Sequence, residues 1–267
     1  MNYKTIILTK EEGVATLTLN RPDTLNAWNE EMGTESLQAI EEIRDDNEVR
    51  VLVVTGAGRG FSSGADLTAM GQRGQVSPTK PSRVTLSTLP GVVRLAGELR
   101  DLDRPTIAAV NGVAAGAGFS IALACDIRIA SDKARFTQIF VKRALVPDSG
   151  ATYFLTKLIG TAKACELMYT GDIINAAEAE RLGIVNKVVP QDKLMDETMA
   201  LAKKIASGPP LTIELIKRAI YKGFVETDLW HQIYYEMHLQ SLAFRTEDFK
   251  EGVMSFIEKR EPKFMGR

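Results

Sequence analysis

Residue types that build metal centres and disulfides are scarce in this chain. Its 267 residues include two cysteines and two histidines. Cys125 and Cys165 both lie in apolar, helix-like sequence, which favours buried thiols over a disulfide or a metal pair. His231 and His238 are seven residues apart on one predicted helix, and no third ligand follows at a metal-binding spacing. The sequence therefore predicts no metal site.

Long apolar runs and an excess of one charge are also missing. No run approaches the roughly 18 apolar residues of a membrane-spanning helix, and residues 1–13 lack the layout of a signal peptide. The net charge of −1 carries no nucleic-acid footprint. Since 45% of the residues are hydrophobic, the chain can bury a substantial core. We expect a cytoplasmic protein with no membrane or nucleic-acid partner.

Small residues, by contrast, concentrate in Val110–Asp126, VNGVAAGAGFSIALACD. The pattern predicts a strand, a tight turn and a buried helix that begins near Ala117. Glycines let another group approach the backbone, and a helix N-terminus offers unpaired N–H groups to negative charge. The same pattern also fits a turn that merely packs a helix against a sheet.

A second strand with a glycine-rich loop occupies Val51–Asp66, VLVVTGAGRGFSSGAD. The run VLVV predicts a buried strand, and small residues follow it. Two loops of this kind can each direct one N–H group at a single oxygen. That is the geometry of an oxyanion hole for a thioester enolate.

Several motifs together resemble the enoyl-CoA hydratase/isomerase (crotonase) family over nearly the whole chain. They are NRPDTLNAW, FSSGAD, NGVAAGAGFSIALACDIRIAS, TGDIINAAEAERLGIVNKVVP and EGVMSFIEKR. The resemblance implies an α/β fold with a crotonase-like β-β-α spiral core over residues 1–190, which holds the CoA-thioester site. It also implies a C-terminal helical region over 191–267 that assembles a homotrimer or homohexamer. Coenzyme A is part of the acyl-CoA substrate in this family, and no separate cofactor is implied.

Periodicity divides the chain in more detail. We expect a hairpin from strands 5–9 and 14–20, a helix capped by Asn29 that ends near Arg44, and a strand over 49–54. This order favours a layered α/β core. Further expectations are a mobile loop over 70–82, helices over 85–101, 151–159 and 162–169, a strand over 184–189, and three or four amphipathic helices after residue 191.

By motif position the resemblance assigns the two oxyanion N–H groups to Ala65 and Ala117. It also exposes a departure from the family pattern. Hydratases of the family carry two catalytic glutamates, and those positions here hold Ser120 and Phe140. Neither side chain can hold and deprotonate a water molecule at neutral pH, so the two-glutamate hydratase mechanism is not expected.

Asp148 stands where a helix is predicted to begin, in the sequence LVPDSG. Aspartate is a common helix N-cap, and capping is one interpretation of this residue. By resemblance, isomerases that act on ring or dienoyl thioesters carry their catalytic aspartate at this motif position. Apolar neighbours such as Phe140 and Val146 would raise the pKa of Asp148 and make it a better base.

The resemblance also implies contacts to coenzyme A and the acyl group. The residues are Arg21, Leu25, Ala27, Ser63, Ala65, Asp66, Leu67, Gly116, Phe140, Phe256 and Lys259. Phe256 and Lys259 would reach the coenzyme from a neighbouring subunit. Thr68 stands where many relatives carry a lysine, so one phosphate contact is lost. For each residue alone, a solvated surface role is the alternative.

The most economical function is a double-bond enoyl-CoA isomerase, of Δ3–Δ2 or ring type, that uses Asp148. The alternatives are an enoyl-CoA hydratase of the same family and a non-catalytic CoA-ester binding protein. A short-chain dehydrogenase is suggested by TGAGRG together with Tyr153 and Lys157 in YxxxK spacing. It is disfavoured because its glycine-rich loop should follow the first strand, not a hairpin and a helix.

Overall fold

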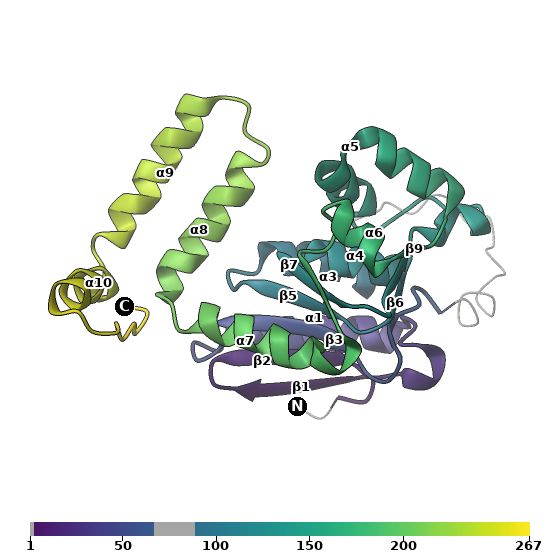
Figure 1. Cartoon of the computed structure of the whole chain (residues 1–267), viewed down its shortest axis with the longest axis horizontal. Helices are drawn as coiled ribbons and strands as arrows, with labels where there is room; N and C mark the ends of the chain where they lie inside the picture. The colour runs from purple at the N-terminus through teal and green to yellow at the C-terminus, as the bar shows by residue number, and fades with distance from the viewer. Residues whose placement is uncertain (1–2, 67–88) are drawn as a thin grey trace.

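The computed structural model of the chain describes residues 3–66 and 89–267. Two β-sheets run through it (Figure 1). The larger sheet has the order β1-β2-β3-β5-β7-β10, and the smaller has the order β4-β6-β8-β9. The larger sheet contains β1 (Ile6–Glu11), β2 (Val14–Leu19), β3 (Val51–Gly56), β5 (Thr106–Val110), β7 (Ile127–Ser131) and β10 (Lys187–Val189). The smaller contains β4 (Gly60–Ser62), β6 (Val113–Ala115), β8 (Arg135–Thr137) and β9 (Ile174–Asn175).

The two sheets grow together along the chain, in pairs of consecutive strands. β3 is followed by β4, β5 by β6 and β7 by β8, so each pair adds one strand to each sheet. β3, β5, β7 and β10 are parallel neighbours. Helices fill the connections between the pairs. The predicted β-β-α spiral core is confirmed by this topology.

The N-terminal hairpin is also confirmed. β1 and β2 pair antiparallel with Glu11 opposite Val14, which leaves a two-residue loop. Its residues, Glu12 and Gly13, both have positive φ (48° and 77°). This is the turn geometry that matches the right-handed twist of the flanking strands.

Helices cover both faces of the larger sheet (Figure 1). On one face pack α1 (Glu30–Arg44), α3 (Gly91–Asp101) and α4 (Ala117–Ala124); on the other packs α7 (Leu194–Ala206). Side chains alternate between the two faces along β3. Leu52 and Val54 join the core under α1 and α3, whereas Val51 and Val53 join the core under α7. A strand buried on both faces accounts for the continuous apolar run in the sequence.

Several predicted boundaries hold and others shift. Asn29 caps α1 through a hydrogen bond from Met32 N–H (2.9 Å), as predicted. α3 begins only at Gly91, because Pro90 adopts an extended conformation (φ −54°, ψ 144°) at the N-cap. The predicted loop over 70–82 and residues 85–88 of the predicted helix lie outside the described residues.

One further prediction holds and another needs correction. The two helices predicted over 151–159 and 162–169 are confirmed: both lie in α5 (Ala151–Thr170), and Gly160 separates them with a non-helical backbone conformation (φ 77°, ψ 162°). The last strand spans Lys187–Val189 rather than 184–189. Ile184 and Val185 follow α6 (Ala176–Arg181) and are buried, but their N–H groups donate to the carbonyl of Ala179 within that helix instead of joining the sheet.

The remaining helices follow α7. They are α8 (Pro210–Gly223), α9 (Leu229–Ala243) and α10 (Glu247–Glu258), and they project away from the sheets (Figure 1). The four helices α7 to α10 agree with the prediction for this region. In the ranges that the structure describes, no helix is both long and apolar enough to cross a membrane.

A buried polar cluster anchors α8 to the core. Asp126 accepts a hydrogen bond from Thr106 N–H (2.7 Å), forms an ion pair with Lys217 (3.0 Å) and accepts a hydrogen bond from the Tyr221 hydroxyl. Lys217 also donates to the carbonyl of Arg104 (3.0 Å). Asp126 therefore joins β5 to α8.

Candidate active site

The backbone around Ala65 leaves one N–H group without an acceptor. Ala65 forms a parallel bridge with Trp28. The bridge uses the neighbours of Ala65: Trp28 N–H donates to the Gly64 carbonyl (2.8 Å), and Asp66 N–H donates to the Trp28 carbonyl (2.9 Å). No residue within 3–66 or 89–267 accepts a hydrogen bond from the Ala65 N–H. Ala65 itself is exposed, so a ligand can approach it.

Ala117 presents a second such group. It is the first residue of α4, after Gly116 in a positive-φ conformation (51°). The first hydrogen bond of the helix runs from Ser120 N–H to the Gly116 carbonyl (3.0 Å). The Ala117 N–H lies in the turn before this bond, and no acceptor for it occurs in the described part of the chain. An unpaired N–H at a buried helix start is what binds negative charge.

The two loops that carry these N–H groups touch each other backbone to backbone. A Cβ at Gly64 would lie 2.8 Å from the Ala115 oxygen and 3.6 Å from the Ala117 nitrogen. A Cβ at Gly118 would lie 2.5 Å from the Ser62 oxygen. Glycine is therefore required at both positions for the loops to meet. The structure brings the two predicted donors into one cluster, as the glycine-rich pattern suggested.

The two positions where hydratases carry glutamate contain no acid–base group. The buried Ser120 hydroxyl donates to the Gly116 carbonyl one turn back (3.1 Å). Phe140 is buried in the 3-10 helix η3 (Ile139–Arg143), and its ring lies 3.7 Å from the position of a Cβ built on Gly116. This residue therefore contributes an apolar wall beside the start of α4.

Asp148 lies in the segment between η3 and α5, and it does not cap α5. The N-cap of α5 is Gly150 (φ 76°), and no side chain caps this helix. Instead, the Asp148 carbonyl accepts from Ala151 N–H (3.0 Å), and its Oδ1 accepts from the Ser149 hydroxyl (2.9 Å). The capping interpretation is wrong because Ser149 and Gly150 turn the chain before the helix begins.

Protein atoms around the Asp148 carboxyl raise its pKa above the usual value of an aspartate. Their desolvation of the carboxyl is the main cause, and the hydrogen bond from Ser149 opposes it. The desolvation is only partial, because Asp148 is exposed at the surface. Of its two predicted apolar neighbours, Phe140 is buried but Val146 is 81% exposed. Desolvation makes a carboxylate a stronger base.

The segments predicted to hold coenzyme A pack together beside Ala65. Ser63 N–H donates to the Leu25 carbonyl (2.9 Å), and the Ser63 hydroxyl donates to the Thr24 carbonyl (3.0 Å). These bonds fix the loop over 21–27 against the segment over 63–66. Leu67 and Thr68 lie outside the described residues.

Arg21 is committed to contacts within the chain. Its guanidinium pairs with Asp66 (3.0 Å) and donates to the Ala27 carbonyl. It therefore ties the loop over 21–27 to the residue that follows Ala65.

Asn26 is an important residue that the sequence reasoning missed. It is buried with φ 56°; its side-chain oxygen accepts from Arg21 N–H (2.9 Å), and its amide donates to the carbonyls of Ala57 (2.9 Å) and Gly60 (2.8 Å). It holds the loop against the turn after β3. The signal was present in NRPDTLNA, because asparagine tolerates the left-handed conformation.

The remaining predicted contacts lie far away in the same chain. Phe256 is 85% exposed on α10, and Lys259 ends that helix. α10 and α4 lie toward opposite ends of the long axis (Figure 1). One chain alone does not bring Phe256 and Lys259 to the cluster around Ala65 and Ala117.

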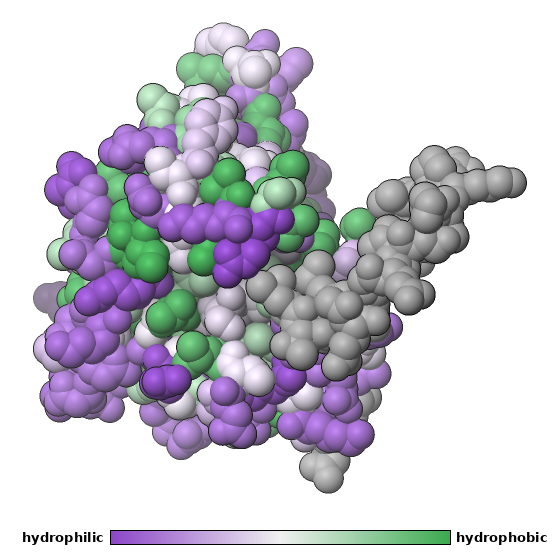
Figure 2. Space-filling view, turned by 90° about the vertical axis from the view of Figure 1, so that its right-hand side faces the viewer, coloured by the Kyte–Doolittle hydropathy of each residue, from purple (hydrophilic) through white to green (hydrophobic). Residues whose placement is uncertain are grey.

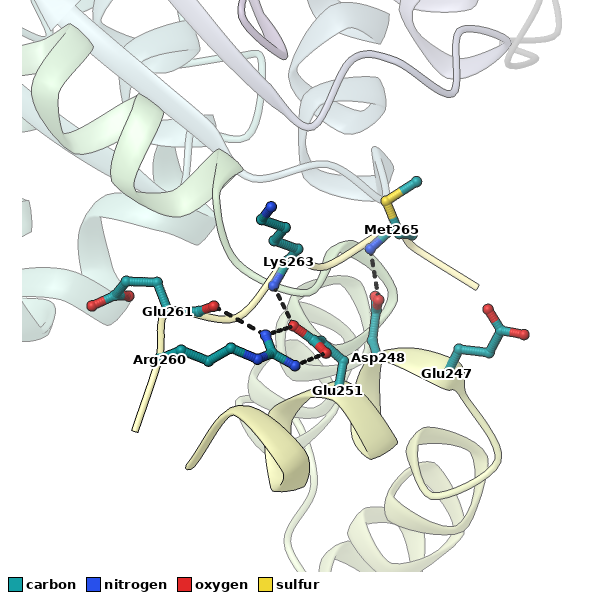
Figure 3. Close-up of a pocket in the computed structure, with 7 residues that line it drawn as sticks. All are labelled: Glu247, Asp248, Glu251, Arg260, Glu261, Lys263 and Met265. Carbon is teal, nitrogen blue, oxygen red and sulfur yellow. Dashed lines mark hydrogen bonds and ion pairs between the residues drawn. The ribbon is translucent and has the colours of Figure 1, made fainter. Parts of the chain in front are cut away.

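A cavity of about 620 Å³ lies elsewhere, between α10 and the C-terminal tail (Figure 3). Its main polar groups bind each other. Both carboxylate oxygens of Glu251 pair with Arg260 (2.6 and 2.8 Å), and Asp248 accepts from the N–H groups of Met265 (2.7 Å) and Gly266 (2.8 Å). These bonds hold the C-terminal tail against α10, and they occupy the Glu251 and Asp248 carboxylates, so the cavity is not a candidate active site. Across the described ranges, no cluster of three or more metal-ligating side chains occurs.

The chain is similar to known proteins over its whole length. The family described as Enoyl-CoA hydratase/isomerase matches residues 9–267. The 1,2-epoxyphenylacetyl-CoA isomerase of Escherichia coli (strain K12) is 40% identical over 258 residues, which cover 96% of this chain and 97% of that protein. The short-chain-enoyl-CoA hydratase of Clostridium acetobutylicum is 40% identical over 262 residues, with coverage of 98% and 97%. A crystal structure of enoyl-CoA hydratase from Bacillus anthracis matches with a TM-score of 0.91 at 33% identity, and covers 99% of this chain and 100% of that chain.

The chain therefore belongs to the enoyl-CoA hydratase/isomerase family, and it is an enzyme with the crotonase fold. The predicted family and fold class are confirmed, and the dehydrogenase alternative does not fit them. The names of the relatives include isomerases and hydratases alike. Family membership therefore leaves the choice between the two reactions to the residues of this site.

Proposed function

We propose that this enzyme moves a double bond within an acyl-CoA thioester, with Asp148 as the proton shuttle. The observation that carries the proposal is the distribution of acid–base groups. Ser120 and Phe140 replace the two hydratase glutamates, while Asp148, a carboxyl with a raised pKa, follows η3 in the chain. A site with one base suits isomerisation, because this reaction requires no activated water.

In the proposed reaction the thioester oxygen accepts hydrogen bonds from the N–H groups of Ala65 and Ala117. Asp148 removes a proton from a carbon made acidic by the thioester, and the electron pair moves onto the thioester oxygen to form an enolate. The enolate then collapses, and Asp148 returns the proton to a different carbon. The double bond has moved, the atoms balance, and the carboxylate is regenerated.

The expected contributions are large enough to matter. One oxyanion N–H donor lowers the barrier by roughly 3 kcal/mol. General acid–base catalysis by a positioned group contributes about 10²- to 10⁴-fold in rate. Phe140 supplies an apolar wall, and an apolar wall keeps water from the enolate.

Asp148→Asn tests the proposal directly. The amide keeps the shape of the side chain but cannot accept the proton, so isomerase turnover should fall by about 10²- to 10⁴-fold while the affinity for the CoA ester is retained. Asp132→Asn is the matched control, since Asp132 is exposed and contacts Gln191 and Lys133 at the surface. Turnover is measured with a 3-enoyl-CoA by a separation that resolves isomers.

The alternative function is an enoyl-CoA hydratase, supported by the names of relatives such as the Clostridium acetobutylicum protein. Brisk hydration of crotonyl-CoA by the wild-type enzyme would favour this alternative. Near-normal isomerase turnover by the Asp148→Asn variant would also reject Asp148 as the shuttle.

A further inference from the structure

Ser149, the residue after Asp148, combines three features that a simple turn residue does not need. It is 3% exposed, its φ is 52°, and its hydroxyl donates to Asp148 Oδ1 at 2.9 Å. A residue with a Cβ rarely adopts this backbone conformation, and glycine or asparagine is more usual there. A buried serine in this conformation indicates that its side chain is used.

We propose that Ser149 is a positioning residue for Asp148: its hydroxyl holds Oδ1, so that Oδ2 remains available to the substrate. This inference rests on the proposed function, in which Asp148 moves the proton. Within the described residues, no other donor bonds the Asp148 carboxyl, and the Ser149 bond is therefore what orients it.

The backbone reinforces this orientation. Gly150 follows with φ 76°, and a Cβ there would lie 2.5 Å from the Phe154 ring. Two successive left-handed residues therefore turn the chain, and the Asp148 carbonyl is held by Ala151 N–H (3.0 Å). The direction of the Ser149 side chain follows from this turn.

Charged groups on the neighbouring elements bond elsewhere. On η3, Arg143 donates to the Lys142 carbonyl, and the Lys142 side chain packs beside Gly171. On α5, Lys157 donates to the Phe224 carbonyl and lies over the Tyr153 and Phe224 rings. None of these groups contributes to the pKa shift of Asp148, which has desolvation and the Ser149 bond as its causes.

The Ser149 bond should matter most when the carboxyl is ionised. A hydroxyl donates more strongly to a carboxylate than to a neutral acid, so it lowers the pKa that desolvation raises. It therefore favours the ionised form of Asp148, which is the form that can accept a proton. It also holds one oxygen still through both proton transfers, which a shuttle needs in order to meet two carbons in turn.

The test uses Ser149→Ala and Ser149→Gly together. Both remove the hydroxyl, but glycine relieves the left-handed backbone and alanine does not. If the hydroxyl positions Asp148, both variants should shift the acidic limb of the isomerase pH profile to higher pH. In both, the plateau kcat should fall on the order of tenfold with KM unchanged. Ser207→Ala is the control, because Ser207 is exposed at the end of α7 and its hydroxyl donates to the Lys204 carbonyl (2.8 Å).

A direct titration of Asp148 by carboxyl ¹³C NMR separates this inference from the function on which it rests. An active wild-type isomerase whose Asp148 titration is the same in both variants would overturn the positioning role alone. A wild-type enzyme without isomerase activity, whose Asp148 titration still shifts in both variants, would overturn the proposed function instead. A purely structural role predicts lower stability for the alanine variant, recovery in the glycine variant and no movement of the pH profile.

Discussion

At the scale of single residues, the first consequence concerns the N–H group of Ala117. This residue occupies the first position of α4, where proline is compatible with a helix because its N–H has no intrahelical acceptor. Ala117→Pro therefore deletes the N–H group that we propose as an oxyanion donor, with little cost to the helix itself. We expect kcat to fall by about 10²- to 10³-fold while the enzyme remains folded by circular dichroism.

The matched control places proline at the first position of another helix. Glu30→Pro alters an exposed residue of α1, after Asn29 in an extended conformation (ψ 178°) that proline accepts. Activity near the wild-type level in Ala117→Pro, or an equal loss in Glu30→Pro, would reject the oxyanion assignment.

Asp148 also links catalysis to stability at the residue scale. Because desolvation raises the pKa of its carboxyl in the folded state, ionised Asp148 destabilises the fold above that pKa. The penalty vanishes once pH falls below the unfolded-state pKa, since both states are then protonated. Asp148→Asn should therefore raise the denaturation midpoint at neutral pH and lose this advantage under acidic conditions. Urea unfolding followed across pH measures the difference, and a destabilised variant at neutral pH would contradict it.

At the scale of elements, the cluster around Asp126 predicts how firmly α8 is held. Lys217 is 8% exposed, and its loss would leave Asp126 without its cation. Lys217→Ala should cost about 3–5 kcal/mol of unfolding free energy. Arg218→Ala, one residue along, should cost only about 1 kcal/mol, because the Arg218 side chain is 47% exposed in its pairs with Asp103 and Glu214. Urea denaturation of both variants tests the contrast, and equal losses would contradict it.

The sequence predicted individual helices and strands better than it predicted how they are arranged. Asn29 before an apolar-periodic run predicted α1 and its cap, and the run VLVV predicted a strand buried on both faces. The order of strands in the two sheets could not be read this way, because pairing joins segments far apart in the chain. The cap at Asp148 failed for a local reason: Ser149 and Gly150 both adopt positive φ, and a serine in that conformation carries no clear sequence signal.

The site was predictable in part for similar reasons. Glycines at 64 and 118 signal close backbone approach, so the cluster of Ala65 and Ala117 could be anticipated. The ion pair of Arg21 with Asp66 could not be anticipated, because a basic residue in a loop is equally compatible with a phosphate contact. The hydrogen bond from Ser149 depends on a side-chain direction that only the folded turn defines.

At the scale of the whole molecule, the C-terminal helices leave apolar surface exposed. Examples are Trp230 (66%) and Tyr234 (70%) on α9 and Ile257 (65%) on α10. Large contiguous apolar surface marks an interface. We therefore keep the prediction of a homotrimer or homohexamer, and light scattering that finds monomers at micromolar concentration would reject it.

Hydrophobic and hydrophilic side chains are mixed on other surfaces of the chain. On the face seen in Figure 2, hydrophobic side chains form separate patches among hydrophilic ones. Some apolar side chains after η3 are also exposed. Val146, which is 81% exposed, precedes Asp148 by two residues, and Tyr169, which is 74% exposed, lies on α5. In an oligomer, such residues would be available to a neighbouring subunit or to the acyl group.

Assembly also predicts that each active site draws on two chains. Phe256 and Lys259 lie far from Ala65 and Ala117 within one chain, yet they are predicted to contact coenzyme A. If they act from a neighbour, the double variant Phe256→Ala/Lys259→Ala should raise KM by about tenfold or more, as expected for a lost stacking contact, and leave Asp148 intact.

Mixing this double variant with Asp148→Asn decides between one chain and two. After the mixed subunits are dissociated and reassembled, some sites combine Asp148 from one chain with Phe256 and Lys259 from its neighbour. Those sites are complete, so isomerase activity at low substrate concentration should exceed that of either variant alone. Separately assembled variants mixed without exchange provide the control. If reassembly restores nothing although native gels show mixed oligomers, the coenzyme contacts come from the same chain as Asp148 or do not exist, because no rearrangement of whole subunits could then rebuild a complete site.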